Sequence, residues 1–244
     1  MSYSPYTSSS DSSSDIELPP AVAVYCGANL GTEPAFHHVA TSLGEAIATQ
    51  ERSLVYGGGS QGIMGIISST VLHHGGSVTA VIPTAMIRGG GEGEPHNSKG
   101  HIELKDHEKV VYVVVKSMHE RKVEMARRAG GFIALPGGFG TFEELMEVAA
   151  WTQLGIHNKP VVLVNVLGFF DPLRMMIRNA VTLGFIKPQN EKLVAFVDCP
   201  PDADPTTFDW GAAALSALDD WCSPGPGMFS WSPTSPNGNG IATY

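Results

Sequence analysis

The chain has 244 residues, a hydrophobic fraction of 43% and a formal net charge of −9 at pH 7. This length and composition predict one globular domain with tails. The net negative charge excludes a general nucleic-acid binder, which needs clustered lysine and arginine. The three cysteines are far apart, which excludes a disulfide framework and a C-x-x-C metal site and indicates a reducing compartment. We see no secretory signal and no apolar run long enough to span a bilayer, so we expect a cytoplasmic protein without a membrane partner.

Serine dominates residues 1–18, and Gly, Pro, Ser and Asn dominate residues 223–244, so we expect both segments to be disordered tails. Between them we expect one domain, residues 19–222, in which short apolar strands alternate with helices. The predicted elements in chain order are strand Ala21–Cys26, helix Ala35–Gln50, strand Ser53–Tyr56, helix Gly62–His74, strand Ser77–Ile82, strand Val110–Val115, helix Met118–Ala129, strand Gly131–Leu135, helix Phe142–Leu154, strand Val161–Val164, helix Pro172–Leu183, strand Leu193–Val197 and helix Thr206–Trp221. Continuous apolar strands separated by helices predict an α/β fold: a doubly wound, Rossmann-like domain with a mainly parallel sheet and helices on both faces.

Ligands of such a fold bind where loops leave the carboxyl ends of the strands. The first glycine-rich loop there is Gly57-Gly58-Gly59-Ser60-Gln61-Gly62, between a strand and a helix. Glycines let the backbone approach an anion, but a tight turn explains the same residues. The next strand ends without the acidic residue of a dinucleotide site, and there is no G-K-[ST] of a P-loop.

The second loop, Pro136-Gly137-Gly138-Phe139-Gly140-Thr141, leads into a helix that carries Glu143 and Glu144. Its N–H groups, at the positive end of the helix dipole, predict a phosphate site. Thr141-x-x-Glu144 is also a capping-box signature, which would make Glu144 a structural residue. Both interpretations stay open, although the loop contains more glycine than a cap needs.

A cationic helix precedes this loop. Met118, Arg121, Lys122 and Met125 share one stripe of it. On this stripe Arg121 would face the sheet and need an anionic partner, either a ligand or a neighbouring glutamate. The alternative is a surface arginine whose stem covers apolar residues while its charged end stays in water. The paired histidines at 37–38 and 73–74 lack a matching ligand set, so we expect no metal site.

These motifs are similar to those of the LONELY GUY family, the cytokinin riboside 5′-monophosphate phosphoribohydrolases. The resemblance lies in Val55–Ser60, in Met118–Lys122 and in the P-G-G-x-G-T-x-x-E run that ends at Glu144, and it extends through Trp151–His157. It covers about residues 20 to 198. It implies a Rossmann-like homodimer or higher homo-oligomer without a cofactor. Such a protein hydrolyses N6-substituted adenosine 5′-monophosphates such as isopentenyl-AMP, and AMP itself, to the free base and ribose 5-phosphate.

The resemblance also assigns residues. It implies that Arg121 and Glu144 are the catalytic pair. It implies that the substrate contacts Gly58, Gly59, Ser60, Glu103, Met118, Lys122, Gly138, Phe139, Gly140, Thr141, Phe142 and Glu143. Glu103 is one of several glutamates in its segment, with Glu92, Glu94 and Glu108, that could take this place.

Cleavage of the C1′–N9 bond passes through an oxocarbenium-like state. We therefore expect Glu144 to stabilise that charge and activate water, and Arg121 to keep Glu144 ionised, since an adjacent cation lowers a carboxylate pKa. The alternative is a non-catalytic nucleotide carrier on the same scaffold, which would need no carboxylate beside Arg121. The sequence gives no support for a pyridoxal enzyme, because no lysine lies in a phosphate cup.

Overall fold

The computed structural model describes residues 21–87 and 107–229 of the chain. Within these ranges seven strands alternate with α-helices and short 3-10 helices. The strands are β1 (Val22–Tyr25), β2 (Ser53–Tyr56), β3 (Ser77–Pro83), β4 (Val110–Val115), β5 (Gly131–Ala134), β6 (Val161–Val164) and β7 (Val194–Val197). The helices are α1 (Pro34–Thr49), α2 (Gly62–His73), η1 (Thr84–Met86), α3 (Met118–Arg128), α4 (Phe139–Leu154), η2 (Val166–Gly168), α5 (Asp171–Thr182), η3 (Pro188–Leu193) and α6 (Trp210–Asp219).

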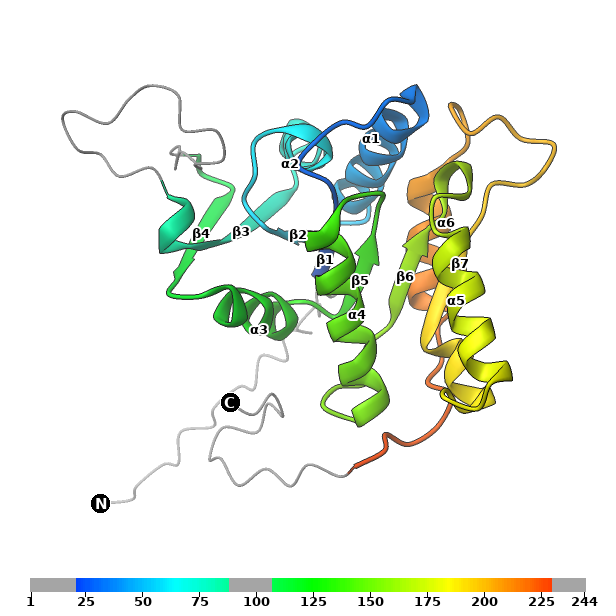
Figure 1. The fold of residues 1–244 in the computed structure, drawn as a ribbon. Helices are drawn as coiled ribbons and strands as arrows, with labels where there is room; N and C mark the ends of the chain where they lie inside the picture. Colours follow the sequence, from blue (N-terminus) through cyan, green and yellow to red (C-terminus); the bar gives the residue numbers. More distant parts are fainter. Residues whose placement is uncertain (1–20, 88–106, 230–244) are drawn as a thin grey trace, which may run out of the picture.

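The strands form one sheet in the order β4-β3-β2-β1-β5-β6-β7, and every neighbouring pair is parallel (Figure 1). The predicted doubly wound α/β fold is therefore confirmed. The chain first winds outward from β1 to β4 and then returns to place β5 on the other side of β1. The strand order thus reverses between β1 and β5, and a crevice opens at such a point between the loops that follow the two strands.

No helix in residues 21–87 or 107–229 is both long and apolar enough to cross a membrane.

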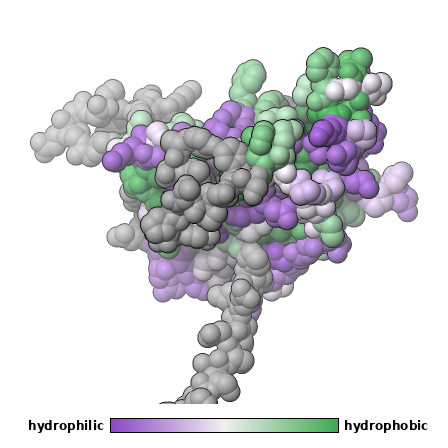
Figure 2. Space-filling view, turned by 90° about the horizontal axis from the view of Figure 1, so that it is seen from below, coloured by the Kyte–Doolittle hydropathy of each residue, from purple (hydrophilic) through white to green (hydrophobic). Residues whose placement is uncertain are grey.

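Figure 2 shows the molecule from below the view of Figure 1, and thus from the side opposite the loops that follow the strands. Hydrophilic and hydrophobic residues lie side by side on the described part of this face.

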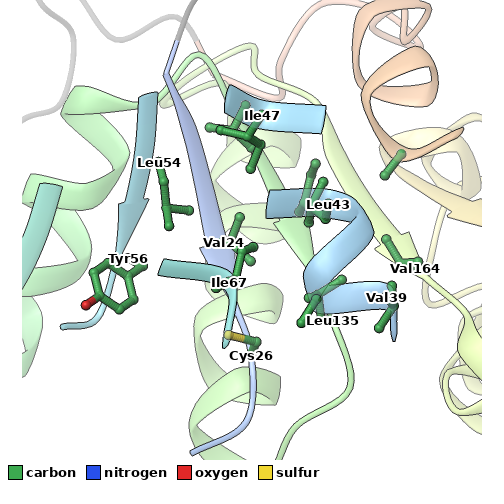
Figure 3. Packing of buried hydrophobic residues seen from close by; sticks show 14 of the residues in the cluster. Val24, Cys26, Val39, Leu43, Ile47, Leu54, Tyr56, Ile67, Leu135 and Val164 are labelled. Atoms are coloured by element: carbon green, nitrogen blue, oxygen red, sulfur yellow. The ribbon is translucent and has the colours of Figure 1, made fainter. Parts of the chain in front are cut away.

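Two apolar layers hold the helices on the sheet. One packs α1, α2 and α6 against one face of the sheet, with Leu43, Ile67 and Trp210 completely buried. Figure 3 shows the α1 side chains of this layer directed at β1, β2 and β6. The other layer packs α3 and α4 against the opposite face through Met125 and Val148. Strands buried on both faces must be apolar throughout, which explains why they read as continuous runs.

Most predicted boundaries differ from the observed ones by one residue, and three of the differences have a clear structural reason. Helix α4 begins at Phe139, three residues before the predicted start, so part of the expected loop is its first turn. Leu193 belongs to η3 and not to a strand. Helix α6 begins at Trp210 and not at Thr206, because the side chain of Asp209 accepts a hydrogen bond from the N–H of Ala212 and caps it there.

Several expectations fall on residues outside the described ranges. These are the tail at residues 1–18, the site residue Glu103, and Glu92 and Glu94, two of the glutamates that could take its place. Of the C-terminal tail, residues 223–229 are described. Two backbone hydrogen bonds connect this stretch to the end of α4, from Met228 N to Gln153 O (3.0 Å) and from Phe229 N to Leu154 O (3.1 Å).

Candidate functional site

A cleft of about 450 Å³ opens between the loops that follow β1 and β5, where the strand order reverses. Helices α1, α2, α3 and α4 and the turn after β6 complete its walls. The lining residues are Cys26, Gly27, Ala28, Asn29, Gly31, Phe36, Ile63, Met64, Met118, Arg121, Pro136, Gly137, Gly138, Gly140, Thr141, Glu143, Glu144 and Phe169.

Close backbone contacts hold the loops of the cleft together. Gly27 N donates to Pro136 O (3.1 Å), and Met64 N donates to Gly27 O (3.2 Å). Gly62 has a positive φ of 62°, and a Cβ there would lie 2.2 Å from the backbone of Ala28. Glycine is thus required at the start of α2 because the loop after β1 passes against it.

Helix α4 begins at the cleft without a side-chain cap. Gly138 is the N-cap residue, and Thr141 is the third residue of the helix. The capping-box interpretation of Thr141 and Glu144 is therefore wrong: Glu144 lies in the second turn. A Cβ at Gly138 or Gly140 would meet nothing within 4 Å, so these glycines leave open space at a helix end whose first N–H groups lack helical partners.

Arg121 and Glu144 form a buried ion pair between α3 and α4, with Arg121 Nη2 3.4 Å from Glu144 Oε1. Ser117 begins α3 as its N-cap, which places Arg121 one turn into the helix and toward the sheet. A Cβ at Gly57 would lie 1.8 Å from Arg121 Nη2. The first glycine of the loop after β2 therefore provides the space for the guanidinium.

Burial raises the pKa of Glu144 to about 7, although the nearby Arg121 lowers it in part. We expected Arg121 to keep Glu144 ionised. Arg121 does lower the pKa of this carboxyl, but the net pKa is raised, so the expectation is wrong for the net effect. Desolvation outweighs the cation because Glu144 is only 7% exposed. With a pKa of about 7, Glu144 is present in both protonation states near neutral pH.

Lys122 lies next to Arg121 but pairs with other carboxylates. Its ammonium binds Glu143, which lines the cleft, and lies 2.9 Å from Glu147 Oε2. Desolvation lowers the pKa of Lys122, but the hydrogen bonds to Glu143 and Glu147 raise it above its ordinary value overall. Lys122 can thus orient Glu143 at the edge of the cleft.

The other expected contact residues lie at different distances from the cleft. Met118, Gly138, Gly140, Thr141 and Glu143 line it. Gly58, Gly59, Ser60, Phe139 and Phe142 are not among its lining residues. A Cβ at Gly58 would meet the side chain of Ile82, and one at Gly59 would meet the side chain of Met64. The backbone of this loop therefore packs against these two side chains. Contact of these residues with substrate stays a prediction.

Sequence reasoning missed the loop after β1 and the apolar residues of the cleft. Cys26–Gly31 contributes one whole edge, and Phe36, Ile63, Met64 and Phe169 add apolar surface. A glycine directly after the first strand, at the reversal of strand order, was an available signal. In residues 21–87 and 107–229, no group of three His, Cys, Asp or Glu side chains is placed to hold a metal ion.

Comparison with known proteins gives three findings. A family model described as "Possible lysine decarboxylase" matches residues 64–204. The chain is 44% identical over 179 residues to a cytokinin riboside 5′-monophosphate phosphoribohydrolase of Arabidopsis thaliana, with 73% of this chain and 72% of the relative covered. A second such relative from Arabidopsis thaliana is 43% identical over 175 residues, with 71% and 74% covered. Among solved structures, the molybdenum cofactor carrier protein of Chlamydomonas reinhardtii superposes with a TM-score of 0.51 at 22% identity. The superposition covers 82% of this chain and 95% of the carrier protein, and at this identity it shows a shared fold alone.

Proposed function

The chain belongs to the LONELY GUY family of cytokinin riboside 5′-monophosphate phosphoribohydrolases, and we propose that it hydrolyses N6-substituted adenosine 5′-monophosphates, and AMP, to the free base and ribose 5-phosphate. The observation that carries this proposal is the buried Arg121–Glu144 pair beside an uncapped helix N-terminus in one cleft. An anion site and an ionisable carboxylate in the same cleft are what hydrolysis of a nucleotide requires.

In this proposal the start of α4 binds the 5′-phosphate. The N–H groups around Gly138, Phe139 and Gly140 meet the phosphate oxygens, and the helix dipole favours their charge. Phosphate binding aligns the ribose, so that binding energy far from the reacting bond is converted into orientation at C1′.

Glu144 acts at C1′. Its carboxylate stabilises the positive charge that develops as the C1′–N9 bond breaks, and it takes a proton from the attacking water. The water oxygen bonds to C1′, the bonding electrons leave with N9, and the departing base gains the proton that the water loses. A pKa of about 7 lets Glu144 both accept and release a proton near neutral pH.

Arg121 orients the nucleotide and pairs with Glu144. Its Nη2 faces the carboxylate, and its buried Nε has no hydrogen-bond partner among the described residues. A buried donor without a partner is costly unless a ligand satisfies it. Arg121 also lines the cleft, so its guanidinium can contact the substrate while its charge faces the carboxylate.

Two other activities fit the site less well. A nucleotide carrier needs the phosphate site but gains nothing from a buried carboxylate that costs stability when it ionises. A pyridoxal-dependent decarboxylase needs a lysine that reaches the cofactor. None of the described cleft-lining residues is a lysine, and Lys159 Nζ donates to Ala126 O at 2.6 Å.

We further propose that the chain forms a homodimer. Large apolar side chains are exposed on α3 and α4 around the cleft, namely Met118, Phe139, Phe142 and Met146, and Phe139 is 92% exposed. Such residues on the surface are typical of an interface. Sedimentation at micromolar concentration should give about twice the chain mass of 25.9 kDa, and a species of the single-chain mass alone would contradict this proposal.

The proposed activity is tested by incubating the protein with AMP, isopentenyl-AMP and adenosine and assaying the released sugar and base. Both monophosphates should yield ribose 5-phosphate, and kcat/KM for AMP should far exceed that for adenosine. Glu144→Gln should lower kcat by on the order of 10²–10⁴ while AMP still binds. Arg121→Ala should weaken both binding and turnover. Normal turnover by Glu144→Gln would overturn the mechanism.

A further inference from the structure

Two phenylalanines from distant parts of the chain meet at the cleft. Phe36 belongs to the first turn of α1, and Phe169 follows η2. Their ring centroids are 6.3 Å apart at an interplanar angle of 80°. Both residues line the cleft that contains Arg121 and Glu144. We call Phe36 and Phe169 the aromatic wall.

The backbone before Phe169 is held in an unusual conformation. Leu167 has a φ of 53° and Gly168 a φ of 73°, so two consecutive residues are left-handed just before the ring. A leucine rarely adopts this conformation, and its side chain is 52% exposed, so burial of that side chain does not explain it. Strain of this kind is typical of positions whose geometry serves a site.

A buried asparagine holds this turn. Asn165 Nδ2 donates to Asp171 Oδ1 (2.8 Å) and to Asp198 Oδ1 (2.6 Å), and its Oδ1 accepts from Phe170 N (2.7 Å). Asn165 is 5% exposed, and its three bonds reach the residue after β7, the first residue of α5 and the turn itself. This network fixes the direction in which the turn presents Phe169.

The geometry points to the aromatic wall as the part of the cleft that binds the purine base. This inference rests on the proposed function and assigns the base-binding part of that site. Apart from Cys26, Ala28, Asn29, Met118 and Pro136, the other described walls supply glycine backbone and an arginine, which suit a phosphate, and a threonine hydroxyl and two glutamates, which suit a ribose. A purine presents a flat apolar face, and aromatic side chains stack on such faces whatever the base. Ile63 and Met64 line the same cleft and extend the apolar surface toward which an N6 substituent can project.

Comparison of two ligands tests the inference. AMP contains the base, whereas ribose 5-phosphate contains only the sugar and the phosphate. Calorimetry is done in the Glu144→Gln background, which should bind AMP with little turnover. There, Phe169→Ala and Phe36→Ala should raise the Kd of AMP at least about fivefold, as loss of one stacked base predicts. The Kd of ribose 5-phosphate should not change, and Phe169→Tyr, which keeps the ring, should retain the affinity for AMP.

Phe185→Ala is the matched control, because Phe185 is 83% exposed and does not line the cleft. It should change neither Kd. If Phe169→Ala does not fold, Phe169→Leu is used in its place. Leucine retains apolar volume without the stacking face, so this variant should raise the Kd of AMP in the same way.

Three results would overturn the inference. They are an unchanged Kd of AMP in the folded variants, an equal loss of affinity for AMP and ribose 5-phosphate, and no binding of AMP by the unsubstituted protein. If the protein binds AMP but does not hydrolyse it, the proposed function fails, while the binding comparison still decides the role of the wall.

Discussion

Replacement of Glu144 by glutamine should change how the stability of the protein depends on pH. The pKa of Glu144 is raised from 4.5 to about 7 in the folded protein. The folded state therefore holds this proton more tightly than the unfolded state does. Between pH 4.5 and 7 the unfolded chain releases the proton first, so the wild-type protein loses stability from this group as pH rises.

The size of the effect follows from the shift. One pKa unit corresponds to about 1.4 kcal/mol, so ionised Glu144 costs about 3 kcal/mol at pH 8, where the cost is fully developed. At pH 5 most of this cost is absent, because the folded carboxyl is still protonated. The free energy of unfolding of Glu144→Gln, relative to wild type, should thus rise by about 2–3 kcal/mol from pH 5 to pH 8.

Urea unfolding at several pH values between 5 and 8 measures this difference. The glutamine leaves Arg121 without its carboxylate at every pH, which adds a constant offset, so only the change with pH is diagnostic. Glu191→Gln is the control, since Glu191 pairs with Arg178 on the surface and does not line the cleft. The diagnostic result is a change with pH that Glu144→Gln shows and this surface variant does not. A Glu144→Gln difference that is the same at pH 5 and pH 8 would refute the argument that burial governs this carboxyl.

Three further results are expected at the same site. If the ionised form of Glu144 is the active one, kcat/KM for AMP should rise with pH and level off above about 7; a profile that is flat from pH 5 to 8 would contradict this. Gly57→Ala should lower kcat/KM at least about tenfold, because the added Cβ would displace the Arg121 guanidinium. A variant with the circular dichroism spectrum and the activity of the wild type would contradict this. Gly138→Ala should fold normally, since its Cβ meets no protein atom, but it should weaken binding of AMP more than that of adenosine in calorimetry; equal effects on both ligands would contradict a phosphate site there.

Local patterns were sufficient to predict most of the fold. Strands such as Val161–Val164 are buried on both faces and therefore read as unbroken apolar runs, which only a covered parallel sheet explains. The start of α4 was not predictable in the same way. Phe139-Gly140-Thr141 has the composition of a loop, and glycine disfavours a helix. The helix nevertheless begins there without a side-chain cap, which leaves its first N–H groups available to an anion.

The site was predictable as far as its residues are close in sequence. The motifs around Arg121 and Glu144 indicated two of its walls, but the aromatic wall joins α1 to the turn after β6, and no local pattern connects these segments. The ionisation of Glu144 shows a second limit. The charge of Arg121 is visible in the sequence and lowers the pKa of its partner, whereas desolvation acts in the opposite direction and depends on how completely α3, α4 and the sheet exclude water. Because the two effects oppose each other, the sequence gives the sign of one of them, and only the packing around the pair decides the net direction.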